Sequence, residues 1–200
     1  MKIKTLFISI VVMMTSCGMN AQDIQLPEPN RKGGMPLMEA IGNRQSAREF
    51  SDFELSQQQL SDMLWTACGY NRPEKRTVAT ALNKQEMSAY VVTAKAVYKY
   101  EPKENKLIHV NAGDHREVFA MQDFAKKAPL NVALVSDLAK QTNEVFAGMT
   151  VGAMSNNIYL WCASEGLNTV VRASFDHEGA KDALKLGETE KVLLVQTVGK

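Results

Sequence analysis

The strongest constraint on the fold is a long helical pattern over residues 145–165, which ends at Gly166. Its apolar side chains occupy more than one face of the helix: Val145, Phe146, Met149, Val151, Met154, Ile158, Leu160 and Trp161. A helix that is apolar nearly all round must be covered on both sides. We therefore expect the chain to form a dimer in which this helix is buried.

Shorter patterns surround this helix. One further helix is predicted over residues 37–41, and another over residues 176–186. A third is predicted between Ser56, a typical N-cap residue, and Gly69, which closes it. Strands are predicted over six short apolar stretches: residues 89–94, 96–100, 107–110, 131–135, 169–172 and 192–198. Because strands and helices do not alternate strictly as in βαβ units, the sequence predicts the α+β class.

Charge, cysteine and histidine content exclude several classes of protein. Lys and Arg number 23 and Asp and Glu 22, so a net charge of +1 provides no field that would attract nucleic acid. The three cysteines contain no C-x-x-C pair and the three histidines lack metal-ligand spacing, so no metal site is predicted. Cys68 and Cys162 lie on predicted apolar helix faces, either as buried thiols or as a disulfide.

The first 21 residues are typical of an export signal. Lys2 and Lys4 precede an apolar run over residues 6–14, which is too short to span a bilayer core of about 30 Å. Two routes of cleavage remain open: signal peptidase cleavage after Ala21, or lipoprotein processing before Cys17, which would leave a lipid anchor on that cysteine. We therefore expect an exported protein, either periplasmic or membrane-anchored.

Residues 22–36 contain three prolines and two glycines, which favour an extended lead-in rather than a domain. No internal repeat or low-complexity segment follows. Residues 37–200 are therefore expected to form a single domain, with order beginning near Leu37.

Arg44, Ser46 and Arg48 stand at alternate positions, so an extended segment would place them on one side. Two guanidiniums and a hydroxyl in this arrangement suit a phosphate, because each guanidinium offers a fork of donors. A solvated basic turn that pairs with Glu39 or Glu49 is the alternative interpretation.

Residues 44–50 (Arg-Gln-Ser-Ala-Arg-Glu-Phe) resemble the R-x-S-x-R-x-F segment of the nitroreductase family of flavin enzymes. The resemblance continues through residues 56–69, 71–77 and 163–172, and it is nearest to the short dehydrogenase-type branch related to thiazole- and oxazole-forming peptide oxidases. It implies a nitroreductase-like fold, with a central mixed or antiparallel sheet flanked by helices. It also implies a homodimer with FMN sites at the interface.

The resemblance also assigns roles to individual residues. Arg44, Ser46 and Arg48 match the motif that grips the phosphate and ribityl chain of FMN. Asn83 matches the Asn of the family's P-S-x-x-N-x-Q segment, which hydrogen-bonds the pyrimidine edge of the flavin, and an amide carries the donor and acceptors that this edge requires. Thr80 keeps the hydroxyl of that segment, although its proline is lost.

A second part of the implied site follows the strand predicted over residues 169–172. Arg172, Ala173 and Ser174 match the stretch whose backbone N–H faces flavin N5, where a hydride arrives. Ala173 stands where the family often has Gly, and its Cβ restricts φ while still allowing a close backbone approach. No catalytic side chain is required by this arrangement.

The resemblance therefore implies an FMN-dependent oxidoreductase with ping-pong transfer from NAD(P)H or another donor to a nitroaromatic, quinone or similar acceptor. The absence of a G-x-S-x-G elbow, a P-loop and a catalytic triad from the sequence agrees with this. Because nicotinamide cofactors are expected in the cytosol, the export signal keeps a second hypothesis open: an exported flavin-binding module with little turnover. A flavin-free structural dimer is the third.

Overall fold

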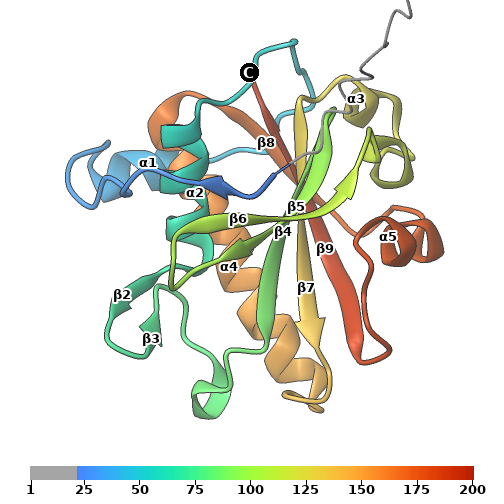
Figure 1. Ribbon diagram of the computed structural model, residues 1–200. Helices are drawn as coiled ribbons and strands as arrows, with labels where there is room; N and C mark the ends of the chain where they lie inside the picture. Colours follow the sequence, from blue (N-terminus) through green and yellow to red (C-terminus); the bar gives the residue numbers. More distant parts are fainter. Residues whose placement is uncertain (1–21) are drawn as a thin grey trace, which may run out of the picture.

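The computed structural model describes residues 22–200, which form a central sheet with helices on both faces (Figure 1). Seven strands lie in the order β1-β6-β5-β4-β7-β9-β8, and every neighbouring pair is antiparallel. Their bounds are β1 Ile24–Gln25, β4 Met87–Thr93, β5 Ala96–Glu101, β6 Lys106–Ala112, β7 Leu130–Asp137, β8 Asn168–Arg172 and β9 Glu190–Gly199. The predicted α+β class is confirmed, with a sheet that is antiparallel throughout the described residues.

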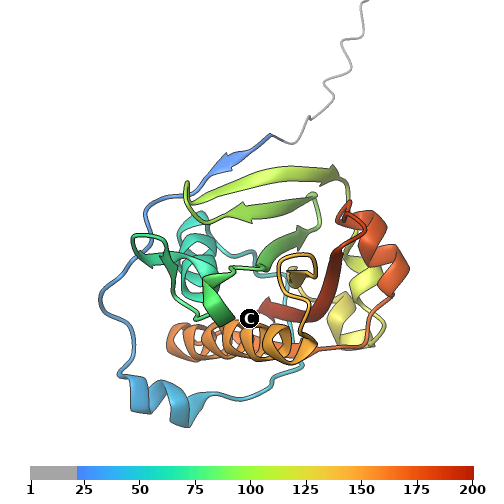
Figure 2. The same ribbon diagram turned by 90° about the horizontal axis from the view of Figure 1, so that it is seen from below.

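Helices cover the two faces of the sheet unequally (Figure 2). On one face lie α2 (Gln57–Cys68) and the long α4 (Glu144–Glu165), with α1 (Leu37–Asn43) on the outside of α4. The other face carries α5 (His177–Ala183), the short α3 (Asp123–Lys126) and the 3-10 turn η2 (Arg116–Phe119). The long helix α4 therefore has the sheet and α2 on one side only.

Local sequence signals explain where the helices begin and end. Ser56 and Gln59 form a reciprocal capping box at the start of α2, and Asn143 accepts hydrogen bonds from the first turn of α4. Gly166 ends α4 in the left-handed conformation, with φ of 64°. The helix predicted to reach residue 186 ends at Ala183, because the chain turns left-handed at Lys185.

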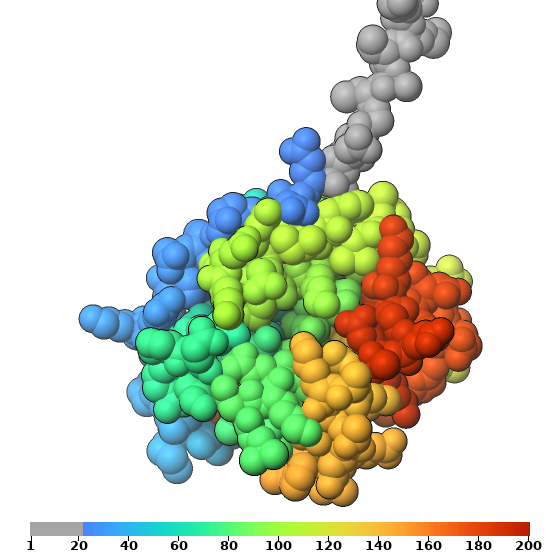
Figure 3. Space-filling model, turned by 60° about the horizontal axis from the view of Figure 1, so that its bottom comes forward, coloured from blue at the N-terminus to red at the C-terminus, as the bar shows by residue number. Residues whose placement is uncertain are grey.

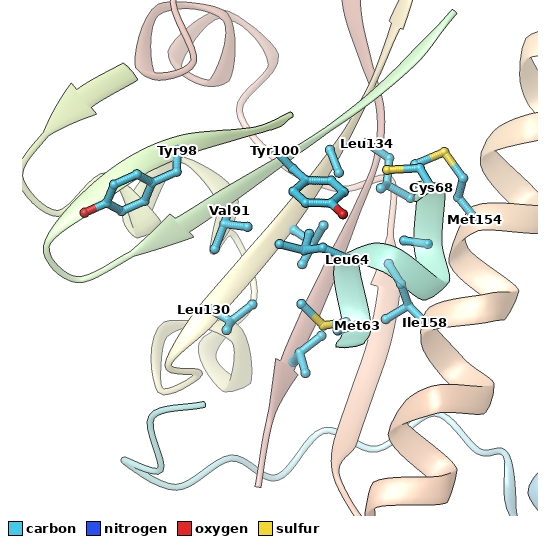
Figure 4. Close-up of a cluster of buried hydrophobic side chains, with 14 of the residues drawn as sticks. Met63, Leu64, Cys68, Val91, Tyr98, Tyr100, Leu130, Leu134, Met154 and Ile158 are labelled. Carbon is cyan, nitrogen blue, oxygen red and sulfur yellow. The ribbon is translucent and has the colours of Figure 1, made fainter. Parts of the chain in front are cut away.

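Alternating side chains of the strands divide the core into two clusters. Ala89 and Val91 of β4 face α2 and α4, whereas Tyr90 and Val92 face α5. Figure 4 shows the first cluster, in which Cys68 of α2 lies close to Met154 of α4.

The two described cysteines are part of this apolar packing. Cys68 and Cys162 are both buried and unpaired, so the disulfide alternative is wrong. Burial raises the pKa of the Cys68 thiol to about 11 and raises that of Cys162 as well. Both thiols therefore act as small hydrophobic side chains.

The extended lead-in belongs to the sheet. Ile24 and Gln25 pair with β6, and Leu26 is only 3% exposed within the first core cluster. The ordered domain thus begins at Ile24 rather than at Leu37, since burial of Leu26 fixes this stretch.

The predicted export signal over residues 1–21, including Cys17, lies outside the described residues. None of the helices within residues 22–200 has the length and apolar character needed to cross a membrane.

Candidate functional site

Residues 44–48, called here the arginine segment, run along the edge strand β8. The Ala47 N–H donates to the Thr169 carbonyl across a distance of 3.0 Å. Ser46 Oγ lies 2.8 Å from the hydroxyl of Tyr159 on α4, and that hydroxyl also accepts from the Val171 N–H at 2.9 Å. The segment is therefore fixed to both the sheet and the long helix.

Both guanidiniums of the arginine segment are exposed and lie over aromatic rings. The Arg44 guanidinium lies 5.3 Å from the centre of the Tyr159 ring, and that of Arg48 lies 5.9 Å from the centre of the Phe124 ring. Among residues 22–200, neither guanidinium forms a salt bridge, so the alternative pairing with Glu39 or Glu49 is not formed. The donors of Arg44 and Arg48 are consequently available to an anion.

Arg172, at the end of β8, has a buried side chain, which is 6% exposed. Its guanidinium donates to Thr197 Oγ1 at 2.8 Å, to Asn131 Oδ1 at 3.0 Å and to the Ser174 carbonyl at 3.2 Å. No carboxylate of the described chain pairs with it, and burial lowers its pKa to about 10. The side chain therefore anchors the turn that follows β8.

Sequence reasoning assigned a role only to the backbone of Arg172 and missed this side chain. The available signal is Asn131 and Thr197, two of the polar residues that lie between apolar residues in the strand segments predicted over residues 131–135 and 192–198. Polar residues at buried positions need partners, and the arginine supplies donors to Asn131 Oδ1 and Thr197 Oγ1.

The turn after β8 presents free backbone donors. Ala173 and Ser174 are exposed, and within the part of the chain described their N–H groups donate to no other protein group. Arg172 and Arg48 approach the same ring, that of Phe124, at 6.0 and 5.9 Å. The structure thus brings the arginine segment and the predicted N5-facing turn together at one edge of the sheet.

Residues 79–86, called here the amide turn, contain the short 3-10 helix η1 (Ala81–Asn83). Thr80 Oγ1 accepts from the Gln85 N–H at 3.0 Å, and Asn83 Nδ2 donates to the Glu74 carbonyl at 3.2 Å. Three residues have positive φ angles, namely Leu82, Asn83 and Gln85, and the Leu82 side chain is 90% exposed. Glu74 lies in the hairpin of β2 (Tyr70–Arg72) and β3 (Lys75–Arg76), which the sequence analysis did not predict.

Within a single chain, the amide turn lies far from the arginine segment. Ala47 is hydrogen-bonded to Thr169 of β8. The strand register places Thr169 level with Val198 of β9, Leu130 of β7 and Thr93 of β4. The amide turn comes just before Met87, at the other end of β4. Met87 and Thr93 are six residues apart, or about 20 Å at the usual strand rise. The predicted contacts of Thr80 and Asn83 therefore lie far from those of Arg44, Ser46 and Arg48.

Figure 3 shows the end of the molecule that carries the amide turn, where the turn (green), the β2–β3 hairpin (teal) and the connection from β7 to α4 (gold) lie side by side. Within residues 22–200, no three His, Cys, Asp or Glu side chains gather into a group that could hold a metal ion.

Comparison with known proteins agrees with the geometry. A sequence model of the nitroreductase family matches residues 41–200. A Methanocaldococcus jannaschii protein described as a nitroreductase is 26% identical, and the match covers 90% of this chain and 98% of that protein.

Solved structures extend the comparison. A Ralstonia eutropha JMP134 protein described as a nitroreductase has a TM-score of 0.86 and 36% identity, covering 92% of this chain and 91% of the other. A chain of the E. coli microcin synthetase McbBCD complex, with 17% identity and a TM-score of 0.68, shares the fold over 98% of this chain and 84% of its own.

Proposed function

This chain belongs to the nitroreductase family of oxidoreductases, and from that premise we propose that it is an FMN-dependent enzyme. It would carry two electrons from a small-molecule donor, NAD(P)H or another, to a nitroaromatic, quinone or similar acceptor. The donor would leave before the acceptor binds, in a ping-pong sequence.

The observation that supports this proposal most directly is the pairing of free cationic and free backbone donors at one edge of the sheet. Arg44 and Arg48 present guanidiniums without carboxylate partners among the described residues, which suits the phosphate of FMN. Ala173 and Ser174 present N–H groups on an exposed turn nearby, which suits the polar edge of a flavin ring. These residues fit the group.

When bound, FMN supplies the two-electron chemistry that side chains lack. The chain's own contribution is to bind and to orient. Arg44, Ser46 and Arg48 hold the phosphate end, while the Ala173 and Ser174 N–H groups hold the ring edge. The buried side chain of Arg172 keeps that turn in place through the Ser174 carbonyl.

We further propose that a second copy of the chain completes the site. The outer side of α1 and α4 carries large exposed apolar side chains: Leu37, Met38, Ile41, Val145, Phe146 and Met149. An apolar surface of this kind is typical of a protein interface. A homodimer would cover it, and the partner's amide turn would supply the Thr80 and Asn83 contacts that one chain holds apart.

We also propose that the protein is exported, as residues 1–21 indicate, either as a periplasmic protein or with a lipid anchor at Cys17. In that location the electron donor need not be a nicotinamide. The second candidate function, a flavin-binding module with little turnover, is favoured by the same location.

The experiment is a flavin titration followed by anaerobic reduction. Purified protein is expected to hold one FMN per chain, and NADH, NADPH or a dehydrogenase-type donor is expected to bleach it. A quinone or nitroaromatic should then restore the oxidised spectrum. Protein without FMN would contradict the proposal, and FMN that no donor bleaches would favour the module without turnover.

A further inference from the structure

A solvent-open pocket of about 480 Å³ lies beside the amide turn, formed by the β2–β3 hairpin, the lead-in and the turn between β5 and β6. Its lining includes Arg31, Tyr70, Arg72, Glu74 and Lys103. We call it the hairpin pocket. The side chains of these residues have no role in the site described above, although the Glu74 carbonyl accepts a hydrogen bond from Asn83 of the amide turn.

Positive charge dominates the hairpin pocket. Three of its lining side chains are cationic, and Glu74 is the single carboxylate among them. Glu74 lies 3.5 Å from Lys103, and Glu28, outside the lining, lies 3.8 Å from Arg31, but both pairs are largely exposed and therefore weak. Arg72 has no carboxylate partner among residues 22–200. An anionic group entering the pocket would therefore meet an excess of positive charge.

Aromatic rings, in addition to the exposed carboxylates, lie beside two of these cations. The Arg31 guanidinium lies 5.6 Å from the centre of the Trp65 ring, and Lys103 Nζ lies 5.9 Å from that of Tyr70. Arg72 Nε donates to Asn71 Oδ1 at 3.3 Å, which leaves the outer fork of its guanidinium for a ligand. That fork matches a carboxylate or phosphate with two parallel hydrogen bonds.

The pocket and the amide turn form one hydrogen-bonded unit. The Tyr70 hydroxyl donates to Gln85 Oε1 at 2.6 Å, and Gln85 Nε2 donates to the Glu74 carbonyl at 2.9 Å. Asn83 Nδ2 donates to the same carbonyl at 3.2 Å. A small molecule that reaches the ring contacted by Asn83 could therefore place its other end in the hairpin pocket.

We propose that the hairpin pocket binds the anionic end of the substrate, so that the enzyme prefers an aromatic compound carrying a carboxylate or a phosphate over its neutral analogue. This inference rests on the proposed function, because it takes the amide turn to lie at the flavin. Tyr70 and Pro73 provide apolar surface beside the cations for the aromatic body.

Three ligands that share a nitrophenyl ring test the inference: 4-nitrobenzoate, 4-nitrophenyl phosphate and the neutral 4-nitrobenzamide. Their dissociation constants are measured by calorimetry on the purified protein without an electron donor. At least one anion should bind about tenfold more tightly than the amide, and the advantage should shrink at high salt. The tighter anion identifies the headgroup as carboxylate or phosphate.

Arg72→Ala should remove most of this advantage, and Lys103→Ala should remove part of it. Lys185→Ala changes an exposed cation outside the pocket and should preserve the advantage. Equal binding of anions and amide, no binding of any of the three, or an unchanged preference in Arg72→Ala would overturn the inference. The FMN content of the protein is measured before each titration, and binding needs no electron donor, so these outcomes are separate from a missing FMN or a flavin that no donor bleaches.

Discussion

The arginine segment and the amide turn carry the two halves of the predicted flavin site, and they are constructed in opposite ways. The arginine segment runs beside β8, tied to it by the Ala47–Thr169 hydrogen bond and to α4 through Ser46. The amide turn leaves the sheet before Met87 and is held by the β2–β3 hairpin and by its own side chains. A motif specifies residue types, whereas only the topology decides which of them one chain can bring to a common ligand.

The largest expected effect comes from the arginine segment. Arg44→Ala combined with Arg48→Ala should weaken FMN binding by about 10²–10⁴-fold, because each charge-assisted contact to phosphate contributes about 1.5–3 kcal/mol. Fluorescence titration with FMN measures the loss. Lys140→Ala combined with Lys185→Ala removes two exposed cations elsewhere and should leave binding intact. Full flavin occupancy in the arginine double variant would remove this segment from the site.

The amide turn should contribute less. Asn83→Leu leaves one edge of the flavin without its hydrogen-bond partner, which should weaken binding by about 1–3 kcal/mol. The same titration measures it, with the adjacent exposed substitution Lys84→Ala as the control. Unchanged affinity in Asn83→Leu would mean that the amide turn does not contact the cofactor.

Mixing the two defective variants sharpens the comparison. In a mixed dimer, an interface site built from both chains pairs one intact arginine segment with one intact amide turn, so about one FMN per mixed dimer should return. If a single chain supplied both halves, every site in the mixed dimer would stay defective. Affinity-tagged mixed dimers, isolated and assayed for flavin, distinguish the two arrangements.

A smaller effect is expected from the link between the arginine segment and the sheet. Tyr159→Phe removes the hydroxyl that contacts Ser46 and accepts from the Val171 N–H, which should destabilise the fold by about 1–3 kcal/mol. Urea unfolding measures the change, and Tyr98→Phe, at a distant place in the sheet, is the control. Equal stability of the two variants would show that this link is not needed to hold the segment.

The smallest effect is expected from the histidines. His115 contacts the Ala112 carbonyl at 2.9 Å, and His177 opens α5 on the surface. Replacement of either by Ala should change turnover by less than about tenfold, well below the 10²–10⁴-fold typical of a lost general acid or base. A steady-state assay with one quinone and one nitroaromatic measures this, and a larger loss would place a side-chain acid in the reaction.

Most of the regular structure could be predicted because its signals are local. Ser56 is both a side-chain cap and part of a capping box, and Gly166 can adopt the left-handed turn that ends α4. The β1 strand could not be predicted, because two paired residues followed by prolines carry no alternating pattern. Its position depends on β6, which is distant in sequence.

The candidate site was predictable as a set of residue types. The sequence motif indicated Arg44, Ser46 and Arg48, and the structure places them beside the turn of Ala173 and Ser174. The separation of the amide turn was not predictable, because it depends on the order of strands between β8 and β4. Neither propensity nor spacing encodes that order.

The buried guanidinium of Arg172 also has a consequence for how the strands align while the protein folds. It crosses β9 to reach Asn131 of β7, so three adjacent strands share one polar cross-link. A slip of β8 by a single residue would carry this charge to the opposite face of the sheet, against the apolar side chains beneath α4. The misaligned sheet would therefore be less stable than the native one. The exposed turn that follows β8 would form at only one position along the edge of the sheet.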